Sequence, residues 1–302
     1  MTYNARHKKI AYACLAVTSI VWGTTWVGSR YAAIHVPGLQ VSYLRQCIAG
    51  TLVLLYFLLK GTKMPSWHQF KWLLIGGFFM FFLNNGMGTW SVHYISGGLG
   101  ALITALNPIC MVVFDFLIFK KRDGNLVTFF GLLTGIVGVV FVLYESAFGP
   151  HPPGYIFGMV ICFIGVIGWS IGSLLIVRNK ITLNPYYAMG WQMLLGSVMI
   201  YLLAILTGNN EPLSQIPMAV WEDIGFLSII GSVLTFMAFI YTLKHLPPAV
   251  ASVYAYINPI IAMLAGAELL HETLTINLLT GSLITIAGVY LVNYSLRKEQ
   301  VD

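Results

Sequence analysis

Long apolar runs alternate with short polar segments along the whole chain, and this pattern predicts ten membrane-spanning helices. About 18 apolar residues in succession mark a membrane span, and most of the runs exceed that length. Because lipid offers the backbone no hydrogen-bond partner, we expect helices; barrel strands would instead alternate apolar and polar residues. The expected spans are 10–34, 38–59, 70–93, 97–119, 125–144, 154–178, 184–207, 222–243, 248–270 and 276–296.

The same features return half a chain later, which indicates an internal repeat. An Asn-Pro pair inside an apolar run, Asn107-Pro108, recurs 151 positions on as Asn258-Pro259. Other features correspond at nearly the same offset: Trp22 with Trp169, Arg45 with Gln192, Gly131 with Gly281, and Gly138 with Gly288. The chain is therefore expected to consist of two similar halves.

The predicted halves are residues 1–147 and 154–302, joined by a Pro/Gly-rich linker at 148–153. Each half holds five spans. Because five is odd, the second half would enter the membrane from the opposite side, which makes the halves inverted repeats. This arrangement is typical of carriers with a substrate site between the halves.

Composition agrees with a membrane protein and argues against a soluble one. The 302 residues are 58% apolar and only 9% charged, with a mean hydropathy of +0.81, whereas soluble domains carry roughly a quarter of charged residues. The net charge of +6 lies in short loops, so it does not form a basic surface for nucleic acid.

The basic residues predict the orientation. With the N-terminus in the cytoplasm, 14 of the 16 Lys and Arg residues fall on the cytoplasmic side, and only Arg30 and Arg45 do not. Acidic residues such as Glu222, Asp223 and Glu272 fall in outer segments. We therefore expect a multi-pass protein of the cell (inner) membrane with both termini cytoplasmic and with an uncleaved first helix.

Uncharged polar and aromatic side chains from both halves are expected to meet near the middle of the membrane. A polar group facing lipid there would cost free energy, so these groups should face the interior of the bundle. The candidate substrate-binding residues are Trp22, Asn84, Asn85, Asn107, Trp169, Ser170, Tyr254 and Asn258.

Two of these features have an alternative, structural interpretation. Pro108 releases the carbonyl of Thr104, and Pro259 releases that of Ala255; the neighbouring asparagines either satisfy those oxygens or bind substrate. The prolines are hinge candidates in both cases.

The tryptophans are either membrane anchors or cavity residues. Trp67 fits an interfacial anchor, whereas Trp22 and Trp169 lie deep and beside small residues that would leave space next to the ring. Tyr254 and Tyr256 are weaker candidates, because either could simply pack.

Few charged residues lie inside the expected spans, and three of them, Arg45, Glu268 and Asp115, need an interpretation. Arg45 and Glu268 have similar depth, so they could pair, and Arg45 could alternatively attract a carboxylate. Asp115 lies close to Lys120, Lys121 and Arg122. We interpret Arg45, Glu268 and Asp115 as structural or coupling charges, with the structural role favoured.

No catalytic or metal-binding motif accompanies these residues. The four cysteines lie in apolar runs without metal-ligand spacing, the histidines have no spaced partner, and no phosphate-binding loop is present. We therefore expect no cofactor, a small neutral or zwitterionic substrate, and facilitated exchange more than tight proton coupling. An intramembrane enzyme, a receptor and a channel are the alternatives from other classes.

The sequence resembles the EamA-type branch of the drug/metabolite transporter superfamily over nearly its whole length. The resemblance rests on Trp22-Gly23-Thr24-Thr25, Arg45, the Asn-Pro pairs, the glycine-rich fifth and tenth spans, and Glu272 with Leu274-Thr275 and Gly281. The stretch Lys120-Lys121-Arg122-Asp123 departs from the family pattern by lacking a glutamate.

The resemblance implies a secondary transporter with alternating access, commonly an exporter of amino acids or other small metabolites. Amphipathic drugs and nucleosides are alternative substrates. Glycines on the fifth and tenth spans would allow close helix approach, within the chain or in a homodimer.

Overall fold

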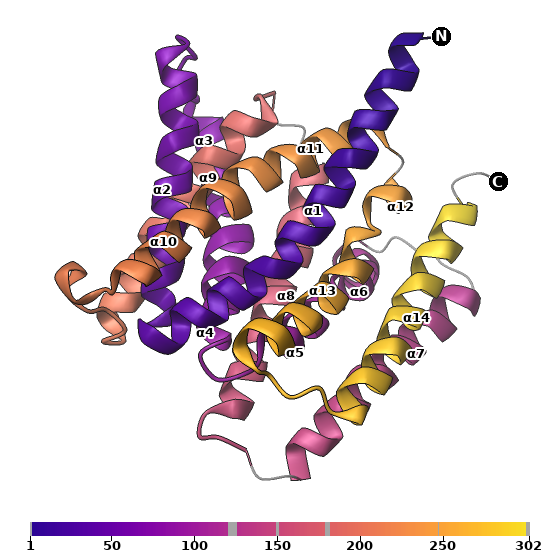
Figure 1. The fold of residues 1–302 in the computed structure, drawn as a ribbon. Helices are drawn as coiled ribbons and strands as arrows, with labels where there is room; N and C mark the ends of the chain where they lie inside the picture. Colours follow the sequence, from indigo (N-terminus) through magenta and orange to yellow (C-terminus); the bar gives the residue numbers. More distant parts are fainter. Residues whose placement is uncertain (1, 120–125, 149–150, 179–181, 247, 300–302) are drawn as a thin grey trace.

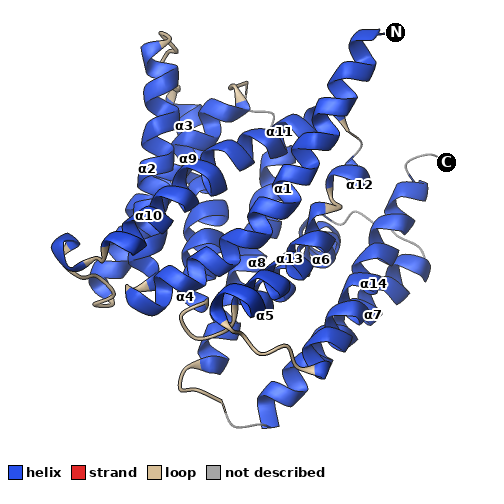
Figure 2. Cartoon of the chain, viewed as in Figure 1, coloured by secondary structure: helices blue, strands red, loops and turns tan. Residues whose placement is uncertain are grey.

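The computed structural model describes residues 2–119, 126–148, 151–178, 182–246 and 248–299, and this part of the chain is helical without strands (Figure 2). Each expected span coincides with one helix or with a series of consecutive helical segments. Six are single helices: α1 Thr2–His35, α2 Gly38–Leu59, α7 Leu126–Phe148, α8 Tyr155–Arg178, α9 Pro185–Leu206 and α14 Ile276–Glu299.

The other four expected spans are interrupted, at corresponding places in the two halves. The third consists of α3 Trp67–Gly76, η1 Gly77–Gly86 and α4 Met87–Ser91, and the eighth of α10 Met218–Phe226, η3 Leu227–Leu234 and α11 Thr235–His245. In both, the middle segment is a π-helix. The fourth is divided into α5 Gly97–Thr104 and α6 Asn107–Phe119, and the ninth into α12 Pro248–Ala251 and α13 Tyr254–Leu270.

The surface of the bundle is apolar, as lipid contact requires. Large apolar side chains are exposed along the helices, among them Phe129 and Ile136 on α7 and Leu283 on α14. Six described helices are long and apolar enough to cross a membrane, and three shorter apolar helices accompany them. The chain is thus a multi-pass membrane protein, while the count of ten spans and the orientation of the termini stay predictions.

Local sequence signals explain where several helices begin. The Ser66 hydroxyl accepts a hydrogen bond from the Gln69 backbone N–H, and the Gln69 side-chain oxygen accepts one from the Ser66 backbone N–H, which forms a capping box before α3. Ser96 caps α5 through the Leu99 N–H at 3.2 Å. Asn184 caps α9, which then starts with proline.

The helices of one half pack on those of the other in exchanged pairs. α1 contacts α11 and α13, and its counterpart α8 contacts η1 and α6. The counterparts α2 and α9 pack on each other, as do α7 and α14. In Figure 1, α7 and α14 lie side by side at one edge of the bundle, apart from the helices around α1. The two halves therefore interlock instead of forming separate lobes.

Glycines bring α7 and α14 into backbone contact. A Cβ atom on Gly131 would lie 2.9 Å from the Gly288 carbonyl oxygen, and one on Gly288 would lie 2.7 Å from the Gly131 oxygen. The glycine faces therefore serve close packing within the chain, as expected for supporting helices. Because these glycines contact each other within one chain, they are not available for contact with a second copy, and they do not support a homodimer.

This packing predicts a loss of stability in Gly288→Ala. The added methyl would meet the backbone of Gly135 and Gly131, and such overpacking costs about 1–3 kcal/mol. We expect a lower unfolding temperature in detergent. The matched control is Gly225→Ala in α10, where nothing lies within 4 Å of the new Cβ and stability should be unchanged or slightly higher. Equal unfolding temperatures of the two variants would contradict the packing.

Candidate functional site

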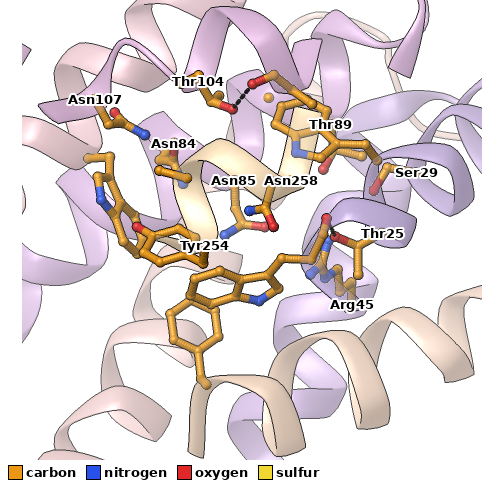
Figure 3. A pocket seen from close by; sticks show the side chains of 18 residues that line it. Thr25, Ser29, Arg45, Asn84, Asn85, Thr89, Thr104, Asn107, Tyr254 and Asn258 are labelled. Atoms are coloured by element: carbon orange, nitrogen blue, oxygen red, sulfur yellow. Dashed lines mark hydrogen bonds between the residues drawn. The ribbon is translucent and has the colours of Figure 1, made fainter. Parts of the chain in front are cut away.

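A cavity lies between the two halves, with about 120 Å³ open to the centres of water-sized molecules. Figure 3 shows amide side chains pointing into it, with Arg45 and Thr25 at one side. The residues that line it are Trp22, Thr25, Trp26, Ser29, Arg45, Asn84, Asn85, Gly88, Thr89, Ala101, Thr104, Ala105, Asn107, Trp169, Phe236, Tyr254, Ala255 and Asn258.

The cavity brings together most of the residues that the sequence singles out. Of the eight candidate substrate-binding residues, all except Ser170 line it. Ser170 is fully buried on α8 and donates to the backbone oxygen of Asn107 at 3.3 Å. Ser170 therefore supports a lining residue and does not face the cavity.

Each Asn-Pro asparagine is hydrogen-bonded to a serine of the other half, one as acceptor and one as donor. Asn107 on α6 is held by Ser170 on α8. Asn258 on α13, with its amide nitrogen oriented toward the acceptors, donates to the carbonyls of Ser19 on α1 at 2.7 Å and of Tyr254 at 3.2 Å. Ser19 precedes Ser170 by the same 151 positions that separate the asparagines. Both asparagines thus have a structural bond as well as a place in the cavity wall.

The two prolines occupy different positions in their helices. Pro108 is the second residue of α6, directly after the interruption at residues 105–106, where a missing N–H is tolerated. Pro259 lies inside α13, five residues after that helix begins. The hinge role of Pro108 and Pro259 stays a prediction.

Asn84 and Asn85 differ from this pair, because their amides have no hydrogen-bond partner in the described part of the chain. They lie at the end of η1, and both face the cavity (Figure 3). π-Helical segments are frequent at functional sites because they displace side chains from the regular α-helical positions. The amides of Asn84 and Asn85 are thus the ones left available to a ligand.

Four aromatic rings form one wall of the cavity. The Trp22 ring lies 4.9 Å from Phe236, 5.3 Å from Tyr254 and 6.3 Å from Trp169, between ring centroids. The Trp22 Nε1–H donates to the Gly231 carbonyl of η3 at 3.1 Å. Edge-to-face contacts of this kind stabilise one arrangement of the rings. The wall is therefore apolar, and its central ring is fixed in orientation.

Trp22 and Trp169 do border open space, but the glycines next to them do not provide it. A Cβ on Gly23 would lie 2.6 Å from Ile261 of α13, and one on Gly172 would lie 2.8 Å from Phe79 and Met80 of η1. These glycines are therefore needed for close helix contact. Thr25 does line the cavity, where its hydroxyl donates to the Trp22 carbonyl.

The side chain of Arg45 is hydrogen-bonded to a residue of the eighth span, and not to Glu268 as expected. Its Nε–H donates to the Ser232 hydroxyl of η3 at 2.8 Å. Asp223 is the acidic group whose charge acts on it. Asp223 was expected in an outer loop, but α10 begins at Met218 and carries Asp223 into the bundle against Gly28.

The remaining predicted residues lie away from the cavity lining. Glu268 is on α13 and Asp115 is on α6, while the three basic residues near Asp115 lie outside the described residues. The Tyr256 hydroxyl donates to the Val289 carbonyl of α14 at 3.2 Å, so Tyr256 ties these two helices together.

Several lining residues were not predicted, although part of the signal was present. Trp22, Thr25, Trp26 and Ser29 follow the spacing i, i+3, i+4 and i+7, which marks one face of a helix. Applying that rule outward from Trp22 would have found this face of α1. Phe236 had no such signal, because its position depends on the π-helical segment before it.

Comparison with known proteins agrees with this architecture. The model of the EamA-like transporter family matches the chain twice, at residues 9–144 and 156–294. The chain belongs to the EamA-like transporter family. The two matched segments nearly coincide with the two halves recognised from the sequence.

Curated relatives of this EamA-family chain are named as transporters. The uncharacterized inner membrane transporter YedA of Escherichia coli K12 is 28% identical over 268 residues, which cover 87% of this chain and 84% of YedA. The uncharacterized transporter YvbV of Bacillus subtilis is 24% identical, with 92% of this chain and 90% of YvbV covered. This chain is thus a membrane transporter by family, and the names of the family and its relatives indicate a transporter rather than an enzyme.

A solved structure supports the fold of this EamA-family chain. A protein crystal structure at 17% sequence identity matches it with a TM-score of 0.66 and covers 96% of this chain and 98% of its own. At that identity the match concerns the fold alone.

Substitution of the asparagines should distinguish an amide that stabilises the fold from one that is free to bind a ligand. Asn258→Ala removes the bonds to Ser19 and Tyr254, and buried side-chain bonds in membrane proteins contribute about 0.6–1.7 kcal/mol. We expect a stability loss of about 1–2 kcal/mol, measured by unfolding in mixed micelles. Asn85→Ala removes no protein hydrogen bond and should keep wild-type stability; an equal loss in both variants would refute the distinction.

Proposed function

We propose that this protein carries a small neutral or zwitterionic metabolite, such as an amino acid, out of the cell by alternating access through the central cavity. The observation that carries the proposal is the lining itself. Residues of both halves meet in one cavity, where an aromatic wall faces amides and hydroxyls. Such a site suits a substrate that has an apolar body and a polar end.

Alternating access follows from two inverted halves that rock about a site between them. Ten spans, in two five-helix repeats, place both termini on the same side. The paired contacts of α1 with α13 and of α8 with α6 support the two-fold relation, because each is the counterpart of the other.

The lining also supports facilitated exchange in preference to tight proton coupling. Among the described residues that line the cavity, none is a carboxylate or a histidine. A group that binds and releases protons during each cycle is normally found in the substrate pathway.

Amphipathic drugs or nucleosides are the second candidate substrate class. The observation that favours them is the group formed by Trp22, Trp169, Phe236 and Tyr254, since aromatic rings stack on planar ligands. Both classes place the ring or side chain of the substrate against the same wall.

Counterflow in proteoliposomes tests the proposal. Vesicles loaded with unlabelled amino acids should accumulate labelled tryptophan, phenylalanine, threonine or serine, and the uptake should saturate. Trp169→Ala should reduce the uptake at least tenfold, because it removes a ring from the aromatic wall. Trp67→Ala, which changes a ring that is 70% exposed, is the matched control and should retain exchange.

Three outcomes of this measurement separate the possibilities. Saturable exchange lost in Trp169→Ala supports a carrier with the site at this wall. Exchange that survives in Trp169→Ala refutes the site. Without exchange of any amino acid, by protein that unfolds cooperatively, the substrate class is wrong, and nucleosides and cationic dyes become the next probes.

Reporter fusions test the proposed orientation. Fluorescent protein fused after Asp302 or inserted at Thr62 should fluoresce, whereas alkaline phosphatase should be active at Asn209, because the basic residues keep their loops in the cytoplasm. The opposite pattern at all three sites would show that the protein has the opposite orientation in the membrane. Mixed results would refute the number of spans.

A further inference from the structure

We propose that Arg45 is the anchor for a carboxylate on the transported molecule. The proposal rests on the function proposed above, since it takes the central cavity as the substrate site. It narrows the substrate to molecules with one carboxylate and an apolar body.

The first observation is the charge of the cavity. Among the described residues that line it, Arg45 alone carries a charge at neutral pH. It is surrounded by amides, hydroxyls and aromatic rings, which do not neutralise it. The lining therefore has a single positive charge, and a site of this kind in a low-dielectric region attracts a single negative group.

The second observation is the incomplete hydrogen bonding of the guanidinium. Arg45 is 5% exposed, and its Nε–H donates to Ser232. In the described part of the chain, its two terminal nitrogens have no hydrogen-bond partner. A guanidinium has five N–H donors and stays charged, so burial leaves the remaining donors in need of acceptors.

The nearest acidic group does not meet this need. Asp223 acts on Arg45 through its charge, but one of its oxygens, Oδ2, is buried and has no hydrogen-bond partner among the described residues. Its other oxygen, Oδ1, packs against Gly28, where it would lie 2.8 Å from an added Cβ atom. Asp223 is not part of the cavity lining. Asp223 therefore offsets part of the cost of burying Arg45 and leaves the cavity side of the guanidinium open to a ligand.

The third observation is that the orientation of Arg45 is fixed. Ser232, which accepts from Nε, is fully buried in η3, and Gly231 beside it accepts from Trp22. The same π-helical segment thus positions the cation and the central ring of the aromatic wall. A planar fork held by its Nε presents two parallel N–H groups, which match the two oxygens of a carboxylate.

A carboxylate fits this site better than a phosphate. A phosphate group carries more negative charge and is normally held by several cations or by a series of backbone N–H groups. Here one guanidinium lies in a lining whose described residues include no second cation. The aromatic wall then receives the apolar part of the molecule.

The test compares acids with their amides on the purified protein. L-Phenylalanine, L-tryptophan, L-leucine and L-threonine are each paired with the corresponding amino acid amide, which keeps the side chain and lacks the carboxylate. Binding is measured as the ligand-induced rise in unfolding temperature, and exchange as competition in counterflow. In the wild type we expect at least one acid to bind and its amide to bind at least tenfold more weakly.

Two substitutions locate the effect at Arg45. Arg45→Gln takes the residue found at the equivalent position, Gln192, and retains an N–H donor toward Ser232; it should weaken the acid at least tenfold and bring acid and amide within threefold of each other. Arg45→Lys keeps the charge without the fork and should retain part of the preference for the acid. If Arg45→Gln does not fold, Arg45→Lys decides the question, because an undiminished preference for the acid in that variant would refute the anchor.

The outcomes separate this proposal from the transport function. Acid-selective binding without exchange would retain the anchor and refute the carrier. Equal exchange of acids and amides would retain the carrier and refute the anchor. The anchor is also refuted if no acid in the panel binds, or if Arg45→Gln keeps the preference for the acid.

Discussion

The need to satisfy every backbone hydrogen bond within lipid governs this structure. An uninterrupted α-helix meets that need without help, and six of the expected spans are helices of this kind. The four departures from regular helix are η1, η3 and the interruptions before Asn107 and before Tyr254. Each contributes lining residues to the cavity or lies directly beside them, as Asn85, Ala105 and Tyr254 illustrate. In the described part of the chain, these irregular segments thus lie in or beside the cavity wall, where polar groups are available to the backbone.

The two halves supply these polar groups to each other. The Gly231 carbonyl in η3 accepts from Trp22 of the first half, and the Asn107 carbonyl accepts from Ser170 of the second half. On the outer flank of α5, Glu272 from the loop before α14 accepts from the Gly97 N–H at 2.9 Å, so its carboxylate caps a helix of the other half. The same exchange explains why the halves interlock: each is incomplete where its own helices are interrupted.

Sequence patterns predicted the helices and the residues that meet in the cavity, because the helices follow from hydropathy and the shared cavity follows from the repeat. The repeat and the depth along the helices together predicted that Asn107 and Asn258 face the interior at one level, and both line the same cavity. The partners of side chains were harder to predict, because they depend on helix rotation. Depth along the helices suggested Glu268 for Arg45, but the π-helical turn of η3 brings Ser232 to it instead. The extension of α10 to Met218, which carries Asp223 inward, likewise has no hydropathy signal, since Trp221-Glu222-Asp223 reads as a membrane boundary.

In a protein made of two similar halves, a substrate with two different ends is distinguished by the positions at which the halves differ. Matched residues, such as Trp22 and Trp169, give both halves an aromatic ring in the cavity wall. At the position held by Arg45 the second half has Gln192, which packs against Gly76 next to η1 and does not line the cavity. Two arginines would have put two buried cations at the same depth, each with its own desolvation cost and with mutual repulsion. One arginine gives the cavity a charged end and an uncharged end, so a substrate with distinct ends can bind in one orientation.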